Sequence, residues 1–134
     1  TRNSREPSAS RLKIGHDDAL DMVVSAAWHR QAKPGADFPK AAQALWGGPV
    51  SWRTAMAYDA TQALATGIAD AGRSPKDITA ERVQQALAMP GFDADGASDS
   101  VQFLPSGDRM LPPQLVTIEA DASAQFGYSF VPVP

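Results

Sequence analysis

The chain has 134 residues, 43% of them hydrophobic, and a formal net charge of −3 at pH 7, which suits one mildly acidic globular domain. No basic patch is visible and the aromatic residues are not interleaved with Lys or Arg, so the composition does not indicate nucleic-acid binding. The absence of cysteine excludes disulfides and thiolate metal sites, and no run of about 18 apolar residues could form a membrane-spanning helix.

The first ten residues, TRNSREPSAS, are polar and aperiodic, and we expect residues 1–10 to form a disordered tail or linker. The first apolar run, Met22–Trp28, has two interpretations, because its apolar residues also fit helical spacing. The β-branched pair Val23-Val24 and the Lys33-Pro34-Gly35 break that follows favour a buried strand.

Three helices are predicted after this strand. The first, Phe38–Trp46, has Pro39 in its first turn and its apolar residues on one side. The longest and most central helix follows Ser51, a residue that caps helices, and ends at Gly72. The third, AERVQQALAM, begins after Thr79 as its cap and ends before Pro90-Gly91.

The central helix is rich in alanine and is expected to pack closely against other elements. Its larger apolar residues recur at three- and four-residue steps, which predicts that they share one buried face. The residues expected in the core are Met56, Leu64, Ile68, Val83, Leu87, Phe103 and Phe130. The residues expected to be exposed are Arg73, Lys76, Asp95 and Asp108.

Beyond Pro90-Gly91 the apolar period changes from 3.6 to 2, which is typical of strands. Strands are predicted around Val101 and Phe103, over Leu115–Glu119, and over the alternating aromatic residues from Phe126 to Phe130, with a turn at residues 105–108. The predicted fold class is therefore α/β, with one strand followed by three helices and a terminal β meander.

Candidate metal ligands are few. His16, Asp17 and Asp18 are adjacent in sequence, so their side chains diverge, and we interpret them as a solvated acidic turn. A calcium loop is a weaker alternative for the acidic residues between positions 93 and 99, because no glutamate closes the loop. The sequence thus predicts no metal site.

The sequence also predicts no catalytic residue and no cofactor. Ser106-Gly107-Asp108 is typical of a turn, no G-x-S-x-G motif occurs, and neither His16 nor His29 is placed by sequence to activate Ser106. We therefore expect a protein that is not an enzyme.

Five segments, taken in order, resemble one known family. They are VVSAAWH, FPKAAQALWGG, VSWRTAMAYDATQAL, VQFLPSGDR and a terminal Phe/Tyr strand. The series is similar to the carboxy-terminal portion of the type I periplasmic binding proteins, in the branch that includes the leucine/isoleucine/valine receptors of ABC transporters. The most specific segment is Trp52–Ala60, followed by Phe103–Arg109, and the match covers roughly Asp21–Pro134.

The resemblance implies a fold of two α/β lobes joined by three crossing segments, with the ligand held in the cleft between the lobes. Residues 11–134 would form a fragment of this fold that contains pieces of both lobes. The implied function is the solute-binding receptor component of an ABC-type uptake system for amino acids or similar small polar solutes. The implied location is the periplasm or the cell exterior, and the implied partner is an ABC permease or a membrane signalling protein.

Within the part that this sequence covers, we expect the start of the central helix to form a ligand wall. Trp52 and Tyr58 offer flat apolar area with a polar edge, and Trp28 is a third candidate contact. A helix N-terminus also favours a carboxylate. The alternative is that Tyr58 is a core tyrosine and that Trp28 packs at a hinge.

A second function remains open, a small self-associating regulatory or protein-interaction domain that binds no solute. The central helix and the strand Met22–Trp28 would present apolar faces, and such faces mark interfaces. We accordingly expect a homodimer, or association with the amino-terminal portion of the family fold.

Overall fold

A computed structural model describes residues 14–31, 37–48, 50–97, 99–124 and 126–133. The chain forms two compact units. One comprises Thr1–Ala26 together with Gln114–Pro134, and the other comprises Ala27–Pro113. The tail predicted at residues 1–10 lies outside the described residues.

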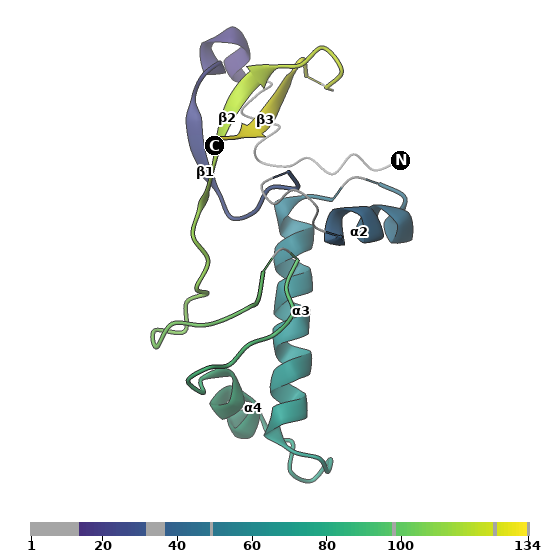
Figure 1. The fold of residues 1–134 in the computed structure, drawn as a ribbon, viewed down its shortest axis with the longest axis vertical. Coiled ribbons are helices and arrows are strands. Elements are labelled where there is room, and N and C mark those ends of the chain that lie inside the picture. Colours follow the sequence, from purple (N-terminus) through teal and green to yellow (C-terminus); the bar gives the residue numbers. More distant parts are fainter. Residues whose placement is uncertain (1–13, 32–36, 49, 98, 125, 134) are drawn as a thin grey trace. The chain divides into compact units, whose positions relative to one another are not determined.

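The first unit is built on a three-stranded antiparallel sheet in the order β1-β2-β3 (Figure 1). Its strands are β1 (Val23–Ala26), β2 (Gln114–Ala120) and β3 (Tyr128–Pro132). The strand interpretation of the first apolar run is therefore confirmed, but β1 is shorter than predicted and is not buried, since Val23 is 55% exposed. Phe126 was expected in the last strand but lies in the turn that precedes β3.

One face of this sheet is packed. Val116 and Ile118 are buried on it, and Phe130 pairs with Ile118 across the strands. Ala19, from the short 3-10 helix η1 (His16–Ala19), packs against the same face. The opposite face carries Leu115, which is exposed. Burial on one face and exposure on the other is the arrangement that strand alternation predicts.

A hydrogen bond joins η1 to the sheet. The hydroxyl of Tyr128 in β3 donates to Oδ1 of Asp17 in η1. This hydrogen bond to a carboxylate raises the pKa of Tyr128 above its usual value. The bond is exposed, so it orients η1 without contributing a buried polar contact.

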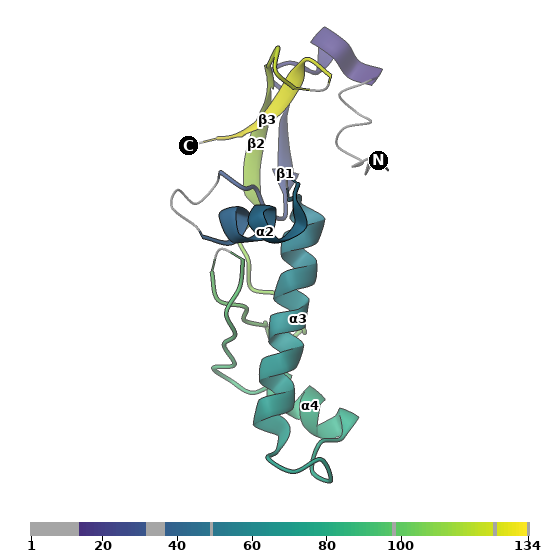
Figure 2. The ribbon, with the colours of Figure 1, turned by 90° about the vertical axis from the view of Figure 1, so that its right-hand side faces the viewer.

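The second unit contains the three predicted helices, α2 (Phe38–Trp46), α3 (Trp52–Ala71) and α4 (Ala80–Leu87). α2 lies beside the first turns of α3, and α4 lies beside its last turns (Figure 2). Ser51 is the N-cap of α3, as predicted, and its N–H donates to Thr54 Oγ1 at 3.4 Å. None of the described helices is long and apolar enough to cross a membrane.

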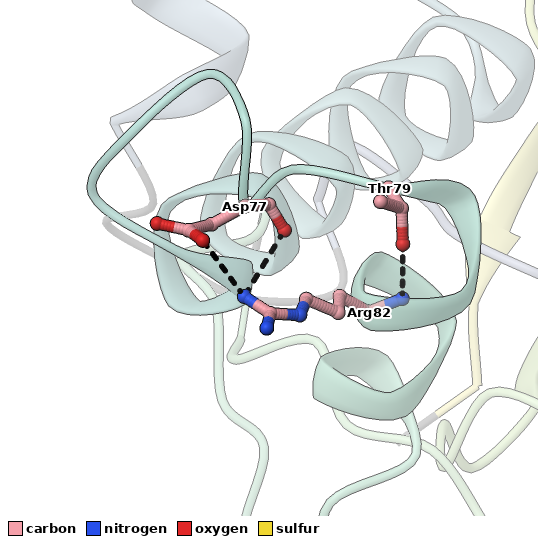
Figure 3. A network of polar contacts seen from close by, with 3 residues as sticks. All are labelled: Asp77, Thr79 and Arg82. Atoms are coloured by element: carbon pink, nitrogen blue, oxygen red, sulfur yellow. Dashed lines mark hydrogen bonds and ion pairs between the residues drawn. The ribbon is translucent and has the colours of Figure 1, made fainter.

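The start of α4 is fixed by polar contacts with the preceding loop (Figure 3). Thr79 Oγ1 accepts a hydrogen bond from the Arg82 N–H at 3.3 Å, which confirms Thr79 as the cap. Arg82 Nη1 lies 3.4 Å from both the carbonyl oxygen and Oδ1 of Asp77. The backbone N–H of Glu81 and the Thr79 hydroxyl hold the pKa of Glu81 below its usual value.

The predicted buried face of α3 is wrong. Leu64 is 51% exposed and Ile68 is 43% exposed. The buried residues of the helix recur instead at four-residue steps, and they are Ala55, Asp59, Ala63 and Gly67. The buried face of α3 is therefore rotated by about one residue from the predicted face. Small side chains on the observed face let the neighbouring segments pack close to the helix.

Gly67 shows how close this approach is. A Cβ atom built there would lie 3.0 Å from Leu87 Cδ2 and 3.6 Å from Val83 Cγ1 of α4. A larger side chain at position 67 would therefore separate the two helices. Leu87 and Val83 are partly buried in this contact, as are the other predicted core residues Met56, Phe103 and Phe130.

The segment after α4 covers the middle of α3. Phe92 and Val101 are buried in a cluster with Ala63 of α3, and the Phe92 and Phe103 rings stack with centroids 5.7 Å apart. The strand predicted around Val101 and Phe103 is reduced to isolated bridges, Ala94↔Val101 and Phe103↔Arg109. The turn at residues 105–108 is confirmed, and the four residues predicted to be exposed are exposed.

Candidate functional site

Four aromatic side chains of the second unit gather around Ala55 on α3. We call Trp28, Phe38, Trp52 and Tyr58 the aromatic cluster. The rings of Trp28 and Phe38 meet edge to face with centroids 6.0 Å apart, and those of Phe38 and Tyr58 lie 4.7 Å apart. Ala55 is fully buried beneath them, and its small side chain allows the rings to approach.

The elements that position the cluster come from three parts of the sequence. Trp52 begins α3 and Tyr58 lies in its second turn, three residues after Ala55, so both flank Ala55 on the helix surface. Phe38 is the first residue of α2, and Trp28 belongs to the loop that follows β1. The cluster therefore joins the starts of two helices to a preceding loop.

The structure brings together all three residues predicted to contact ligand. Trp52 and Tyr58 are half-buried, and the guanidinium carbon of Arg53 lies over the Trp52 ring, 4.9 Å from its centroid. Trp28 is 7% exposed and forms part of the floor beneath them. Their role as ligand contacts stays a prediction. Phe38 is a member of the cluster that sequence reasoning treated only as part of the apolar side of α2.

A buried ion pair lies directly next to the cluster. Asp59 follows Tyr58 on α3 and is 2% exposed. Its Oδ1 accepts a hydrogen bond from the Ala97 N–H at 2.6 Å, and its Oδ2 pairs with Arg109 Nη1. The same Nη1 lies 3.4 Å from the sulfur of Met56, which packs against the cluster. Both oxygens of the carboxylate therefore lead to residues of the cluster that contains Trp28, Ala97 through Oδ1 and Met56 through Arg109.

Sequence reasoning missed this pair, although one signal was available. A carboxylate at position 59 stands in a row of small residues spaced four apart, from Ala55 to Gly67. An acidic residue in the most closely packed row of a helix must have a specific partner, because an unpaired buried charge is strongly unfavourable. The partner itself, Arg109, could not be identified by spacing.

The other polar groups considered from the sequence lie in local hydrogen bonds. Asp93 Oδ2 accepts from Gln102 Nε2 at 2.7 Å, and the Ser106 hydroxyl donates to Asp108 Oδ2 at 2.9 Å. Asp17 is exposed in η1, a 3-10 helix where a turn was expected. Within the described part of the chain, no three His, Cys, Asp or Glu residues are grouped as metal ligands.

A concave feature lies away from the cluster, between the last turn of α3 and α4. It is an open hollow of about 530 Å³, bordered by Asp70 on α3, Arg82 and Gln85 on α4, and Phe92 after α4. Its walls mix opposite charges with a small apolar floor. It has no aromatic wall comparable to the cluster, so the cluster is the stronger candidate site.

The fold is shared with amino-acid-binding proteins of known structure. A leucine-, isoleucine-, valine-, threonine- and alanine-binding protein from Brucella ovis matches 96% of this chain with a TM-score of 0.76 and 13% sequence identity. A leucine-binding protein from Thermotoga maritima matches 91% with a TM-score of 0.65 and 17% identity. An ABC transporter substrate-binding protein from Desulfitobacterium hafniense, solved in complex with Leu, matches 84% with a TM-score of 0.61 and 20% identity.

These likenesses show the fold, which is that of a fragment of a periplasmic-binding-protein-like structure. The chain spans 34% of the Brucella protein, 33% of the Thermotoga protein and 32% of the Desulfitobacterium protein. No family model matches the sequence. No curated protein matches it either.

Proposed function

We propose that the chain is a fragment of the solute-binding component of an ABC-type uptake system for amino acids or similar small polar solutes, and that the aromatic cluster forms one wall of its site. The observation that carries the proposal is the convergence of Trp28, Trp52 and Tyr58 around Ala55, in a chain whose fold is shared with amino-acid-binding proteins. The protein would act by holding a solute, without catalysis.

The chemistry of the wall suits a small amphipathic molecule. The rings of Trp52 and Tyr58 offer apolar area to an aliphatic side chain, and their N–H and O–H groups serve polar edges. The first turn of α3 presents backbone N–H groups without intrahelical partners, next to the positive end of the helix dipole. An amino-acid carboxylate placed there would be stabilised while its side chain lies on the rings.

A thermal-shift series tests this function. Each of L-leucine, L-isoleucine, L-valine, L-threonine and L-alanine is added to the chain at millimolar concentration, with D-leucine as the matched control. A solute that binds the native state raises the melting temperature by mass action, by an amount that grows with its concentration. Stabilisation by at least one L-amino acid and not by D-leucine supports a receptor, whereas identical melting curves in all samples would argue against solute binding.

By the same proposal the protein is exported to the periplasm or the cell exterior, where it presents its solute to an ABC permease or a membrane signalling protein. Ligand capture would proceed by closure of a cleft between two lobes, in which the ligand stabilises the closed form. A receptor of this class needs no cofactor, because binding and closure involve no bond-making step.

A second proposal concerns association. Leu64 and Ile68 lie exposed on one side of α3, and Val23 is exposed on β1, so apolar surface is available for another chain. We propose that the chain forms a homodimer through such surfaces, or binds the remaining portion of the fold through them. Light scattering at micromolar concentration distinguishes a dimer from a monomer. If the chain dimerises and no solute raises its melting temperature, the function is that of a self-associating interaction domain.

A further inference from the structure

Within the described residues, Asp59 is the one polar or charged residue that is buried. Burying a carboxylate and pairing it with an arginine is weak support for stability, since apolar residues of similar volume often stabilise a fold as well or better. A stabilising role alone therefore does not account for a carboxylate at this position. Unlike an apolar residue, Asp59 forms directional contacts with two groups, and these contacts fix the positions of both groups.

The first of these atoms is the backbone N–H of Ala97. Asp59 Oδ1 accepts from it at 2.6 Å, across 38 residues of sequence. Ala97 is itself buried and packs with Trp28 and Ala55 in the core of the aromatic cluster. The hydrogen bond thus sets the position of a residue that forms part of the floor under the rings.

The fit between α3 and this segment is tight. A Cβ atom at Gly96 would lie 3.1 Å from Asp59 Oδ1 and 2.0 Å from the Asp99 carbonyl oxygen. Only a residue without a side chain fits there, so the chain next to Ala97 is held against α3 at a closely defined distance. Without an acceptor at position 59, the hydrogen bond that holds Ala97 against α3 would be lost.

The second atom is Nη1 of Arg109, which pairs with Asp59 Oδ2. The guanidinium also reaches the sulfur of Met56 at 3.4 Å, and Met56 packs against the aromatic cluster from α3. One carboxylate therefore controls two neighbours of the rings, Ala97 through Oδ1 and Met56 through Arg109.

From these contacts we infer that Asp59 is a positioning residue for the ligand wall. It holds Ala97 and Met56 so that the rings of Trp28, Trp52 and Tyr58 keep one arrangement, without itself touching the ligand. The inference deepens the proposed function and rests on it where ligand affinity is concerned. The arrangement of the rings can be measured without any ligand.

The experiment tests the contact with Ala97, and it compares two residues at position 59 in the Arg109→Met background, which removes the link to Met56 and leaves no charge unpaired. Asp59→Asn keeps an oxygen that can accept from the Ala97 N–H, whereas Asp59→Leu has the same branching at Cγ, a larger volume and no acceptor. Circular dichroism selects a temperature at which both variants are fully folded. If the leucine variant does not fold, Asp59→Ala replaces it, because the smaller side chain also lacks the acceptor and cannot overpack the site.

The first readout is acrylamide quenching of Trp28 fluorescence, with Trp46 and Trp52 changed to phenylalanine so that Trp28 alone emits. We expect quenching to remain low in the asparagine variant and to increase severalfold in the variant without an acceptor. Equal quenching in the two would overturn the inference, because a residue that only stabilises the fold does not change the environment of Trp28 in fully folded protein.

The second readout is the affinity for L-leucine with the native tryptophans in place. We expect binding to weaken about tenfold when the acceptor is removed and to stay near the asparagine value when it is kept. If the unmodified chain does not bind any amino acid, the proposed function fails, and the quenching result still decides whether Asp59 positions the cluster. Equal affinities in variants that differ in quenching would contradict the link between ring position and ligand binding.

Discussion

The face of α3 that packs can be tested with two neighbouring residues, Ala63 and Leu64. Ala63 is 3% exposed and contacts Phe92, Ala94 and Val101, whereas Leu64 is 51% exposed. Hydrophobicity alone would place the leucine inside and the alanine outside. The structure reverses this order. Shortening Leu64 should therefore destabilise the fold only slightly, whereas enlarging Ala63 should destabilise it more.

The magnitudes follow from burial. Fully burying a leucine side chain contributes about 1.5–3 kcal/mol, so a side chain that keeps half of its exposure contributes about 1 kcal/mol. Leu64→Ala should therefore lower the free energy of unfolding by about 1 kcal/mol, less than the roughly 2–5 kcal/mol of a core leucine. Ala63→Leu adds three carbon atoms to a filled site and should cost about 1–3 kcal/mol through overpacking.

Urea denaturation followed by circular dichroism measures both free energies of unfolding in the same buffer. Light scattering on the same samples shows whether Leu64→Ala also changes self-association, which would add to its effect. A loss above about 2.5 kcal/mol for Leu64→Ala in a monomeric sample, together with a tolerated Ala63→Leu, would show that the α3 face described here is wrong.

Two further predictions concern caps and pH. Thr79→Ala removes the N-cap of α4 and should lower the free energy of unfolding by about 1 kcal/mol, and an unchanged free energy would contradict the cap. The pKa of Glu81, followed by NMR, should rise towards its usual value in this variant, and an unchanged pKa would contradict the hydrogen bond between Thr79 and the Glu81 carboxylate. The hydrogen bond to Asp17 raises the pKa of Tyr128, so the folded chain holds the phenolic proton more tightly than the unfolded chain does. This hydrogen bond therefore stabilises the fold fully below pH about 10, the usual pKa of tyrosine. The stabilisation is lost as pH rises through the pKa of Tyr128 in the folded chain. Denaturation curves between pH 8 and about 11 should show this loss in the native chain and a smaller one in Tyr128→Phe, and equal losses would refute it.

The elements of the fold were predictable because their signals are local. Thr79 Oγ1 accepts from the Arg82 N–H and the Ser51 N–H donates to Thr54 Oγ1, so both caps act within three residues, and both helices begin where these residues predict. β1 was predicted from its β-branched pair. α4 ends at Leu87 and not at Met89, since the last turn of a helix is decided by contacts that the sequence does not state.

The packing of α3 could not be predicted in the same way. Its apolar and small residues define two adjacent faces, and the helical period fits both. The choice depends on Leu87, Val101 and other residues distant in sequence, which approach closely only where α3 has no large side chain. Val101 and Phe103 likewise have strand periodicity, but each has a single bridge partner in the described chain.

The candidate site was partly predictable. Trp52 and Tyr58 stand out at the start of a capped helix, and helical geometry places each of them beside Ala55, from which both are three residues away. Trp28, Phe38 and Arg109 come close to the start of α3 only in the folded chain. They are distant from α3 in sequence, and no motif in the sequence indicates that they lie near it. Resemblance to a family added Trp28 to the prediction, and the structure places it in the same cluster as Trp52 and Tyr58.

Calorimetric titration of the chain with L-leucine tests the central claim most directly, that the aromatic cluster is a solute-binding wall. Trp52→Ala removes a half-buried ring from the cluster, and Trp46→Ala removes an exposed ring of α2 that lies outside it, which makes the second variant a matched control. The account predicts that L-leucine binds the native chain and the control with the same affinity and binds Trp52→Ala at least about tenfold more weakly. Equal affinities for the two tryptophan variants, or no heat of binding with the native chain, would contradict it.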